Sequence, residues 1–186
     1  AGTRAGVSHS DLKNAIRKGS ILDVLAWHTM QKNDYIYIPA GTVHALGPGL
    51  LVYELQQSSD LTYRVYDWDR SPMVGRELHI EKSLESADAV MASPHHLPKQ
   101  SQDNQSLTLV DCAYFRLQHY MIAEKILSMD TNSASLHAIT VIDGKAEIQT
   151  ENGFYPLQKF ESLLIPAALG SYSISGSCEF LLASNK

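Results

Sequence analysis

Three things are scarce in this sequence: cysteine, long apolar runs and positive charge. The 186 residues include two cysteines, Cys112 and Cys178, and neither belongs to a Cys-x-x-Cys pair. This spacing argues against a thiolate zinc site. Because both cysteines lie in apolar stretches, we expect two buried, unreactive thiols and a reducing, cytoplasmic setting.

No stretch approaches the roughly 20 apolar residues that a membrane-spanning helix needs. The first six residues lack the apolar segment of a secretory signal. Lys and Arg number 15 against 20 Asp and Glu, which gives a net charge of −5. Since no basic stripe can neutralise phosphates, we expect neither nucleic acid nor membrane as a partner. A phosphorylated small molecule is compatible, because one or two local cations suffice to bind it.

The first third of the chain changes from a helical to a strand pattern. Residues 8–27 predict a helix that Ser10 caps, that breaks at Gly19 and that resumes over 21–27. Its buried face should carry Leu12, Ala15 and Ile16. Alternating and β-branched residues then predict strands at 35–38, 50–55 and 61–68.

The rest of the chain predicts a connector and then an all-β half. Residues 71–106 have the composition of a connector, with a short helix within 77–91. Asp143-Gly144 and Asn152-Gly153 are typical hairpin turns. The expected strands are 107–110, 114–121, 136–142, 145–150, 162–165, 172–174 and 178–183. We therefore predict a mainly β protein whose second half is a sandwich or small barrel.

An internal repeat links the two halves. Residues 31–40, QKNDYIYIPA, resemble residues 158–167, QKFESLLIPA, so each position has its counterpart 127 residues later. A repeated supersecondary unit predicts two β-modules of one kind. The turns at Pro39 and Pro166 should therefore superpose.

The first copy of the repeat continues to a histidine. Its pattern N-x5-P-x-G-x2-H, ending at His44, resembles the second motif of the cupin superfamily, G-x5-P-x-G-x2-H-x3-N, with Asn33 for the first glycine. Pro and Gly make a tight turn, and the next strand aims an imidazole into the barrel, where it can bind zinc. Ser171 takes the place of His44 in the second copy. We therefore predict a metal-bearing first module and a metal-free second one.

A more specific resemblance covers nearly the whole chain. Residues 37–47, YIPAGTVHALG, resemble the region around the last zinc ligand of type I mannose-6-phosphate isomerases (phosphomannose isomerases). Residues 54–67, ELQQSSDLTYRVYD, are similar to the segment that follows it in the short bacterial members, and residues 76–83 to the linker beyond. The resemblance implies the C-terminal portion of such an isomerase, built from cupin-type (RmlC-like jelly roll) β-modules with a short helical N-terminal segment.

The resemblance also implies a set of site residues. His44 would be a zinc ligand, Arg64 the catalytic arginine, and Glu54 would line the pocket of the phosphorylated hexose substrate. Apart from the resemblance, Tyr63 is a further candidate for substrate binding. The sequence itself agrees in part, because a carboxylate at Glu54 among apolar neighbours is costly to bury unless Arg64 or a metal pairs with it. An outward position on a half-exposed strand is the alternative for Glu54. Packing at the core or rim is the alternative for Tyr63.

One part of the family pattern is missing. No His-x-His occurs, and the 32 residues before the cupin motif are too few for the strands of a barrel. We therefore expect residues 1–70 to be the C-terminal part of a catalytic cupin barrel with a helical lead-in, residues 71–106 a connector, and residues 107–186 a second, metal-free cupin-like domain.

Two explanations for the missing part stay open. The chain is either a fragment of a longer enzyme or a short homologue that another chain completes, for example in a homodimer through exposed strand edges. In either case one Zn²⁺ would belong to each complete site, and the isolated chain would be inactive. The alternative function is a non-catalytic sugar-binding or regulatory cupin module, or a structural module that folds with a missing partner.

Overall fold

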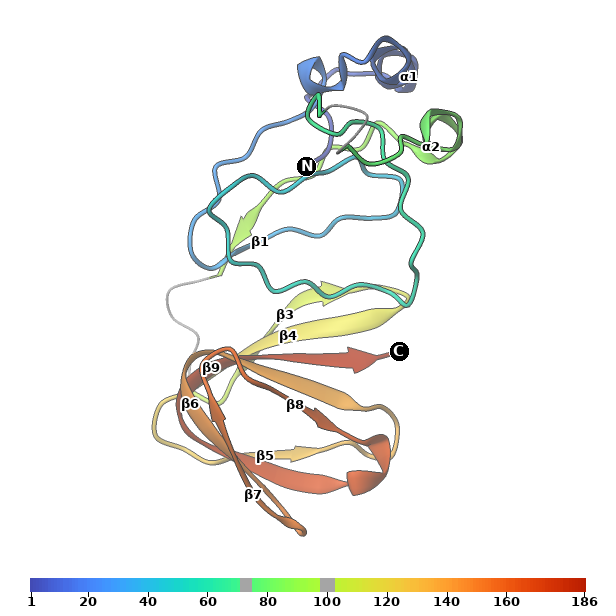
Figure 1. Ribbon diagram of the computed structural model, residues 1–186. Helices are drawn as coiled ribbons and strands as arrows, with labels where there is room; N and C mark the ends of the chain where they lie inside the picture. Colours follow the sequence, from blue (N-terminus) through green and yellow to red (C-terminus); the bar gives the residue numbers. More distant parts are fainter. Residues whose placement is uncertain (71–74, 98–102) are drawn as a thin grey trace. The chain divides into compact units, whose positions relative to one another are not determined.

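The computed structural model describes residues 1–70, 75–97 and 103–186 (Figure 1). The chain divides into two compact units, residues 1–54 with 58–97, and residues 55–57 with 98–186. The boundary between the units falls inside the predicted connector, residues 71–106. Its residues 75–97 belong to the first unit, and its residues 103–106 belong to the second. Residues 71–74 and 98–102 of that connector lie outside the described residues.

The first unit is built around two helices. Its elements are α1 (His9–Lys18), the short 3-10 helix η1 (Ile21–Asp23), β1 (Asp34–Tyr35), α2 (Ile80–Ser86) and β2 (His95–His96). The predicted face of α1 is buried, and it packs with α2 in one apolar cluster. The buried members are Leu12, Ile16, Ile21, Leu84 and Ala87.

The ends of α1 correct two details of the sequence prediction. Ser8, not Ser10, is the N-cap, because its hydroxyl accepts from the Asp11 N–H and the Asp11 carboxylate accepts from the Ser8 N–H. Gly19 ends the helix in the left-handed conformation, as its position predicted. The expected continuation over 21–27 is wrong beyond the single 3-10 turn of η1.

The strands predicted at 50–55 and 61–68 do not form. Of the strand predicted at 35–38, only Tyr35 lies in a strand, because β1 ends there. That strand pairs antiparallel with β2. An alternating sequence becomes a strand only where a neighbouring backbone offers hydrogen bonds. The two-stranded β1–β2 sheet offers none to residues 50–55 or 61–68. Apolar side chains of these segments remain exposed, Leu51 at 80% and Leu61 at 74%.

The second unit is an antiparallel β structure, as predicted. Seven strands run in the order β3-β4-β9-β6-β7, with β5 paired to β9 and β8 paired to β6. The elements are β3 (Ser106–Asp111), β4 (Phe115–Ile122), β5 (Leu127–Asp130), β6 (His137–Thr150), β7 (Gly153–Gln158), β8 (Ser162–Ile165), the 3-10 helix η2 (Ala167–Leu169) and β9 (Ser171–Asn185). Figure 1 shows the long strands β6 and β9 curving through this unit.

The core of the second unit lies on one face of these strands. Along β9, Tyr172, Ile174, Phe180 and Leu182 are buried in it. Leu181 and Ala183 belong to a separate apolar cluster on the opposite face. The remaining buried members of the core are Tyr120, Ile122, Ile139, Val141, Ala146, Ile148, Leu157, Ile165 and Cys178.

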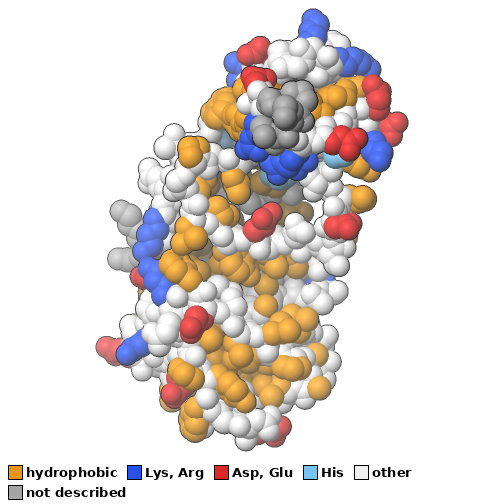
Figure 2. Space-filling view, in the orientation of Figure 1, with side chains coloured by type: hydrophobic (Ala, Val, Ile, Leu, Met, Phe, Trp, Pro, Cys, Tyr) orange, Lys and Arg blue, Asp and Glu red, His pale blue; other side chains and the backbone are white. Residues whose placement is uncertain are grey.

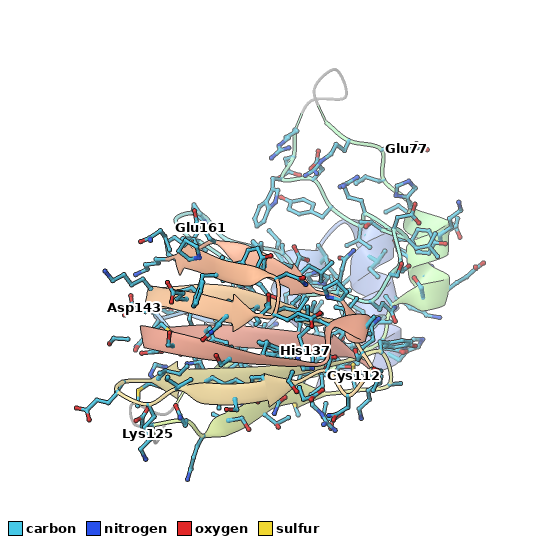
Figure 3. The ribbon with its side chains drawn as sticks, turned by 90° about the horizontal axis from the view of Figure 1, so that it is seen from below. Glu77, Cys112, Lys125, His137, Asp143 and Glu161 are labelled. Atoms are coloured by element: carbon cyan, nitrogen blue, oxygen red, sulfur yellow. The ribbon has the colours of Figure 1, made fainter. Side chains whose placement is uncertain are left out.

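One of the two predicted hairpin turns is wrong. Asp143-Gly144 lies inside β6, where the pairing with β9 shifts register after Val141 (Figure 3). Gly144 has φ of +72°, and a Cβ there would lie 2.1 Å from the carbonyl oxygen of Ser177. A glycine at this site therefore marks a bulge and a close backbone approach, not a turn. The predicted turn at 152–153 is confirmed between β6 and β7.

The internal repeat is confirmed at the level of single hydrogen bonds. In the first copy the Asp34 N–H donates to the carbonyl of Gln31 at 3.1 Å, and the Asp34 carboxylate accepts from the Gln31 N–H at 2.7 Å. In the second copy Glu161 and Gln158 make the same two contacts at 3.0 and 2.7 Å. The two acidic residues are 127 positions apart, as are their partners.

The backbone of the two copies also agrees. Asn33 and Phe160, again 127 positions apart, both have φ of +71°, a conformation that is uncommon for residues other than glycine. Each copy then makes a turn that its proline begins, with hydrogen bonds of 3.2 Å across residues 39–42 and 3.1 Å across residues 166–169. The two segments thus share their local geometry, as the repeat predicted.

Candidate functional site

The turn that carries His44 is fixed against the end of helix α2. Gly41 has φ of +85°, and a Cβ on it would lie 2.9 Å from the carbonyl oxygen of Ser86. The Asp88 N–H donates to the carbonyl of Gly41 at 2.9 Å. Only glycine fits this approach without strain. The glycine of the cupin-like motif therefore sets the direction in which the chain leaves toward His44.

The His44 ring is exposed, and its tautomer is set by the backbone. Its Nδ1 lies 3.0 Å from the carbonyl oxygen of Thr42. Because a carbonyl can only accept, Nδ1 carries the proton and the lone pair of Nε2 is available. A metal-bound histidine has this same arrangement, in which one nitrogen donates to an orienting oxygen and the other faces the metal.

Arg64 is half-buried, and the next residue, Val65, packs on the helical core of the first unit. Its backbone is held on both sides by His79, whose Nδ1 accepts from the Arg64 N–H at 3.2 Å and whose N–H donates to the Arg64 carbonyl at 2.8 Å. Among the described residues, the guanidinium of Arg64 forms no ion pair. The structure thus anchors the backbone of Arg64 and leaves its charge available.

Glu54 and Tyr63 differ in how far they are fixed. Glu54 is exposed, and its carboxylate has no hydrogen bond or ion pair among the residues described here, so the structure places it in the outward position that was the alternative. Tyr63 is 37% exposed. Its ring lies 6.1 Å from the ring of His79, and the Lys82 ammonium lies 5.7 Å from its centre. Tyr63 therefore belongs to a cluster with His79 and Lys82.

The sequence alone did not identify this cluster. His79 had the position of a residue that flanks a helix, and it is indeed the N-cap of α2. Its contact with Arg64 joins residues 15 positions apart and depends on the path of the chain between them. The similarity of residues 76–83 to the isomerase linker is the one sequence signal that pointed to this stretch.

The described residues do not complete a metal site. Within residues 1–70, 75–97 and 103–186, no group of three or more His, Cys, Asp or Glu side chains lies close enough together to hold a metal. No hydrogen bond or ion pair joins any two of His44, Glu54 and Arg64 in this part of the chain. The expected set of site residues is therefore spread over one unit without direct contact among these three side chains.

Cys112 and Cys178 do not form a disulfide with each other. Cys178 is buried in the core of the second unit, and burial raises the pKa of its thiol to about 11. Cys112 is half-buried, and its thiol donates to the carbonyl of Phe115 at 3.5 Å. The prediction that both thiols are buried is thus confirmed for Cys178, whereas Cys112 is partly accessible.

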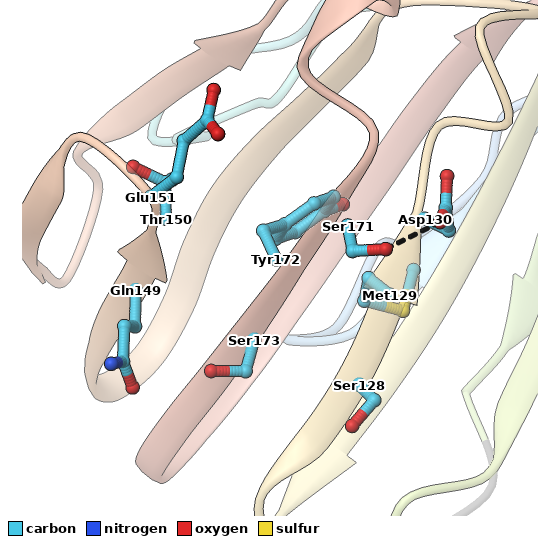
Figure 4. A pocket seen from close by; sticks show the side chains of 9 residues that line it. All are labelled: Ser128, Met129, Asp130, Gln149, Thr150, Glu151, Ser171, Tyr172 and Ser173. Atoms are coloured by element: carbon cyan, nitrogen blue, oxygen red, sulfur yellow. Dashed lines mark hydrogen bonds between the residues drawn. The ribbon is translucent and has the colours of Figure 1, made fainter.

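An open cavity of about 770 Å³ lies within the second unit (Figure 4). Ser171, the counterpart of His44 in the repeat, lies at its wall and donates to the Asp130 carboxylate at 2.6 Å. This hydrogen bond helps to lower the pKa of Asp130. The lining residues are Ser128, Met129, Asp130, Gln149, Thr150, Glu151, Ser171, Tyr172 and Ser173.

Comparison with known proteins gives one consistent family. Residues 105–185 match the model of the family described as mannose-6-phosphate isomerase, cupin domain. Over 183 residues the chain is 33% identical to mannose-6-phosphate isomerase ManA of Bacillus subtilis (strain 168), covering 93% of this chain and 56% of that protein. Over 179 residues it is 31% identical to the mannose-6-phosphate isomerase of Streptococcus mutans, covering 94% and 55%.

A solved structure supports the same relationship. The crystal structure of the mannose 6-phosphate isomerase from Bacillus subtilis matches with a TM-score of 0.73 and 29% identity, over 98% of this chain and 58% of that one. The chain therefore spans just over half the length of the relatives it matches. The cupin-type fold and the resemblance stated from the sequence are confirmed. In the part of the chain that the structure describes, no helix has the length and apolar character to cross a membrane.

Proposed function

We propose that the chain belongs to the mannose-6-phosphate isomerase family and forms part of a zinc-dependent enzyme that interconverts mannose 6-phosphate and fructose 6-phosphate. The observation that carries the proposal is the imidazole of His44, whose Nδ1–H is engaged by the Thr42 carbonyl so that Nε2 can bind a metal. The remaining ligands would come from sequence outside these 186 residues or from another chain.

The fit of this chain to zinc is partial. Catalytic zinc sites use three protein ligands and keep a fourth position open. His44 offers one ligand, and the described residues gather no group of three. When bound, zinc would supply Lewis-acid polarisation of the sugar oxygens. The isolated chain should bind zinc weakly, since a single imidazole is a poor site.

The proposed role of Arg64 follows from its charge. The reaction moves a proton between C1 and C2 of the sugar and places negative charge on an enediol oxygen. A guanidinium keeps its charge at any working pH, and no ion pair neutralises that of Arg64 within the described residues. A fixed positive charge beside the developing oxyanion lowers the barrier. Glu54 and Tyr63 would bind sugar hydroxyls.

The proposal extends to partners and location. The substrate would be a phosphorylated hexose, and a homodimer through exposed strand edges is the second way in which the site could be completed. The location would be cytoplasmic, since two cysteines outside any Cys-x-x-Cys pair suit a reducing setting. A non-catalytic sugar-binding or regulatory cupin is the alternative function, and the observation that favours it is the lack of a three-ligand group in the described residues.

Zinc content and isomerase activity test the proposal. The purified chain alone should hold less than one zinc and should not turn over. Fused to the part of Bacillus subtilis ManA that it does not match, it should hold one zinc and isomerise mannose 6-phosphate. Turnover by the unassisted chain would contradict the incomplete site. A folded fusion without zinc or activity would favour the non-catalytic cupin.

A further inference from the structure

Two hydrogen bonds tie His79 to the backbone of Arg64. The Arg64 N–H donates to His79 Nδ1 at 3.2 Å, and the His79 N–H donates to the Arg64 carbonyl at 2.8 Å. Arg64 lies in a segment that forms no strand, so no sheet ladder holds it. At Arg64 the two contacts with His79 take the place of the backbone hydrogen bonds that a neighbouring strand would provide. Since Nδ1 accepts, the His79 ring must be neutral with its proton on Nε2.

His79 is itself held firmly. It is the N-cap of α2, and its carbonyl accepts the Ser83 N–H at 2.9 Å. Two residues of α2, Ile80 and Leu84, pack in the helical core of the first unit. Polar side chains at an N-cap usually bond to the N–H groups of their own helix. The ring of His79 makes no such bond and is directed to Arg64 instead.

The surroundings of the ring keep it in this orientation. The ring of Tyr63 lies 6.1 Å from it at an angle of 57°. The Lys82 ammonium, one turn along α2, lies 5.7 Å from the centre of the Tyr63 ring. Among the described residues, Tyr63 thus lies beside the His79 ring, and Lys82 in turn lies beside Tyr63.

We propose that His79 is a positioning residue for Arg64, because its ring fixes the backbone from which the guanidinium extends toward the site. This inference rests on the role proposed for Arg64. It adds that the direction of the guanidinium depends on the helix α2 core through one neutral imidazole. Protonation of His79 turns Nδ1 into a donor and breaks the bond.

The first test uses the 186-residue chain without zinc or substrate. In ¹⁵N-labelled protein, a coupling across the hydrogen bond between the Arg64 amide nitrogen and His79 Nδ1 should appear. His79→Ala should speed up amide exchange at Arg64 by about 10-fold or more, while the amides of α1 keep their rates. His79→Asn, whose amide oxygen can accept in place of Nδ1, should restore slow exchange. No coupling, together with unchanged exchange in His79→Ala, would overturn the proposal.

The second test uses the active fusion protein. His79→Ala should lower kcat on the order of 10- to 100-fold through misplacement of Arg64, with His79→Asn recovering most of it. Arg64→Ala, measured in parallel, separates the two ideas. A normal kcat in Arg64→Ala would reject the role proposed for that arginine. A lowered kcat in Arg64→Ala beside a normal one in His79→Ala would reject the positioning role alone.

Discussion

Two histidines of the first unit show how a backbone partner decides what an imidazole can do. His44 Nδ1 lies against a carbonyl, so it carries the proton and Nε2 keeps a lone pair. His79 Nδ1 lies against the N–H of Arg64, so it accepts and Nε2 carries the proton. The first ring is ready to bind a metal and the second is not. Spacing in the sequence singled out His44, but the tautomers follow from the neighbouring backbone.

Substitution of the two proposed site residues should separate metal binding from catalysis in the active fusion protein. His44→Ala removes a ligand and should empty the zinc site, as measured by metal content. Arg64→Ala should keep the zinc and lower kcat on the order of 10²-fold, because a preorganised charge beside the transition state is lost. If Arg64→Ala raised only KM, the arginine would instead anchor the substrate, for example at its phosphate.

A histidine of the second unit should make that unit sensitive to acid. Burial lowers the pKa of His137, whose Nδ1 lies 2.7 Å from the Tyr172 hydroxyl, although the charge of Asp130 opposes the shift. A lowered pKa means that the folded state prefers the neutral ring. The resulting stability is present above the unfolded value of about 6.5 and is lost as pH falls below it.

Denaturant unfolding of the second unit between pH 7 and 5 measures this loss. The midpoint should fall on acidification, and His137→Gln should flatten the change over this range. His95→Gln, at an exposed position in the first unit, is the matched control and should leave the acid response of the second unit unchanged. An equal pH dependence in His137→Gln would reject His137 as the cause.

At the scale of elements, the chain was predictable where its contacts are local. The face of α1 with Leu12 and Ile16 and the helix end at Gly19 followed from the sequence, because a helix bonds to itself. The strands of the second unit were found for a related reason, since their partners lie in the same 84 described residues, 103–186. Residues 50–55 and 61–68 have an equally good strand pattern but no pairing strand in the described part of the chain.

The same reasoning applies to the site. The cupin-like spacing was sufficient to single out His44, because the turn that holds it is local and needs Gly41. The burial argued for Glu54 failed, since it depended on a strand that does not form. His79 could not be found by spacing, because its partner Arg64 lies 15 positions away in the sequence and no motif links the two.

The bulge in β6 makes a prediction about glycine. At Gly144 a Cβ would lie 2.1 Å from the Ser177 carbonyl, whereas at Gly153, also with positive φ, it would meet no atom within 4 Å. Gly144→Ala should therefore destabilise the second unit by at least about 2 kcal/mol more than Gly153→Ala does, since backbone must shift. Thermal or denaturant unfolding of both variants measures the difference. Similar losses in the two would mean that β6 and β9 can separate at the bulge at little cost.

At the scale of the molecule, the two units differ in how they bury apolar surface. The second unit has a core of 13 buried residues between its strands. The first has a smaller helical core and exposes many large apolar side chains, and hydrophobic groups are visible on its surface in Figure 2. The most exposed of these in the first unit are Leu51 (80%), Leu61 (74%), Trp27 (68%), Met91 (68%) and Leu46 (60%). Exposed apolar side chains in this number favour an interaction surface on the first unit.

This surface predicts self-association of the isolated chain. Apolar area left in water costs ~25 cal/mol per Å², so two copies gain by covering it. Sedimentation velocity should show dimers or larger species whose share grows with concentration, and Leu51→Glu with Leu61→Glu should shift the chain toward monomer. Leu164→Glu, at an exposed apolar position of the second unit (62%), is the matched control and should leave the distribution unchanged.

Under the proposed function the same surface receives the missing part of the enzyme, so the active fusion should sediment without the association that Leu51 and Leu61 cause. A clean monomer of the unaltered chain at high concentration would contradict the prediction, because its apolar segments would then be stable in water without a partner.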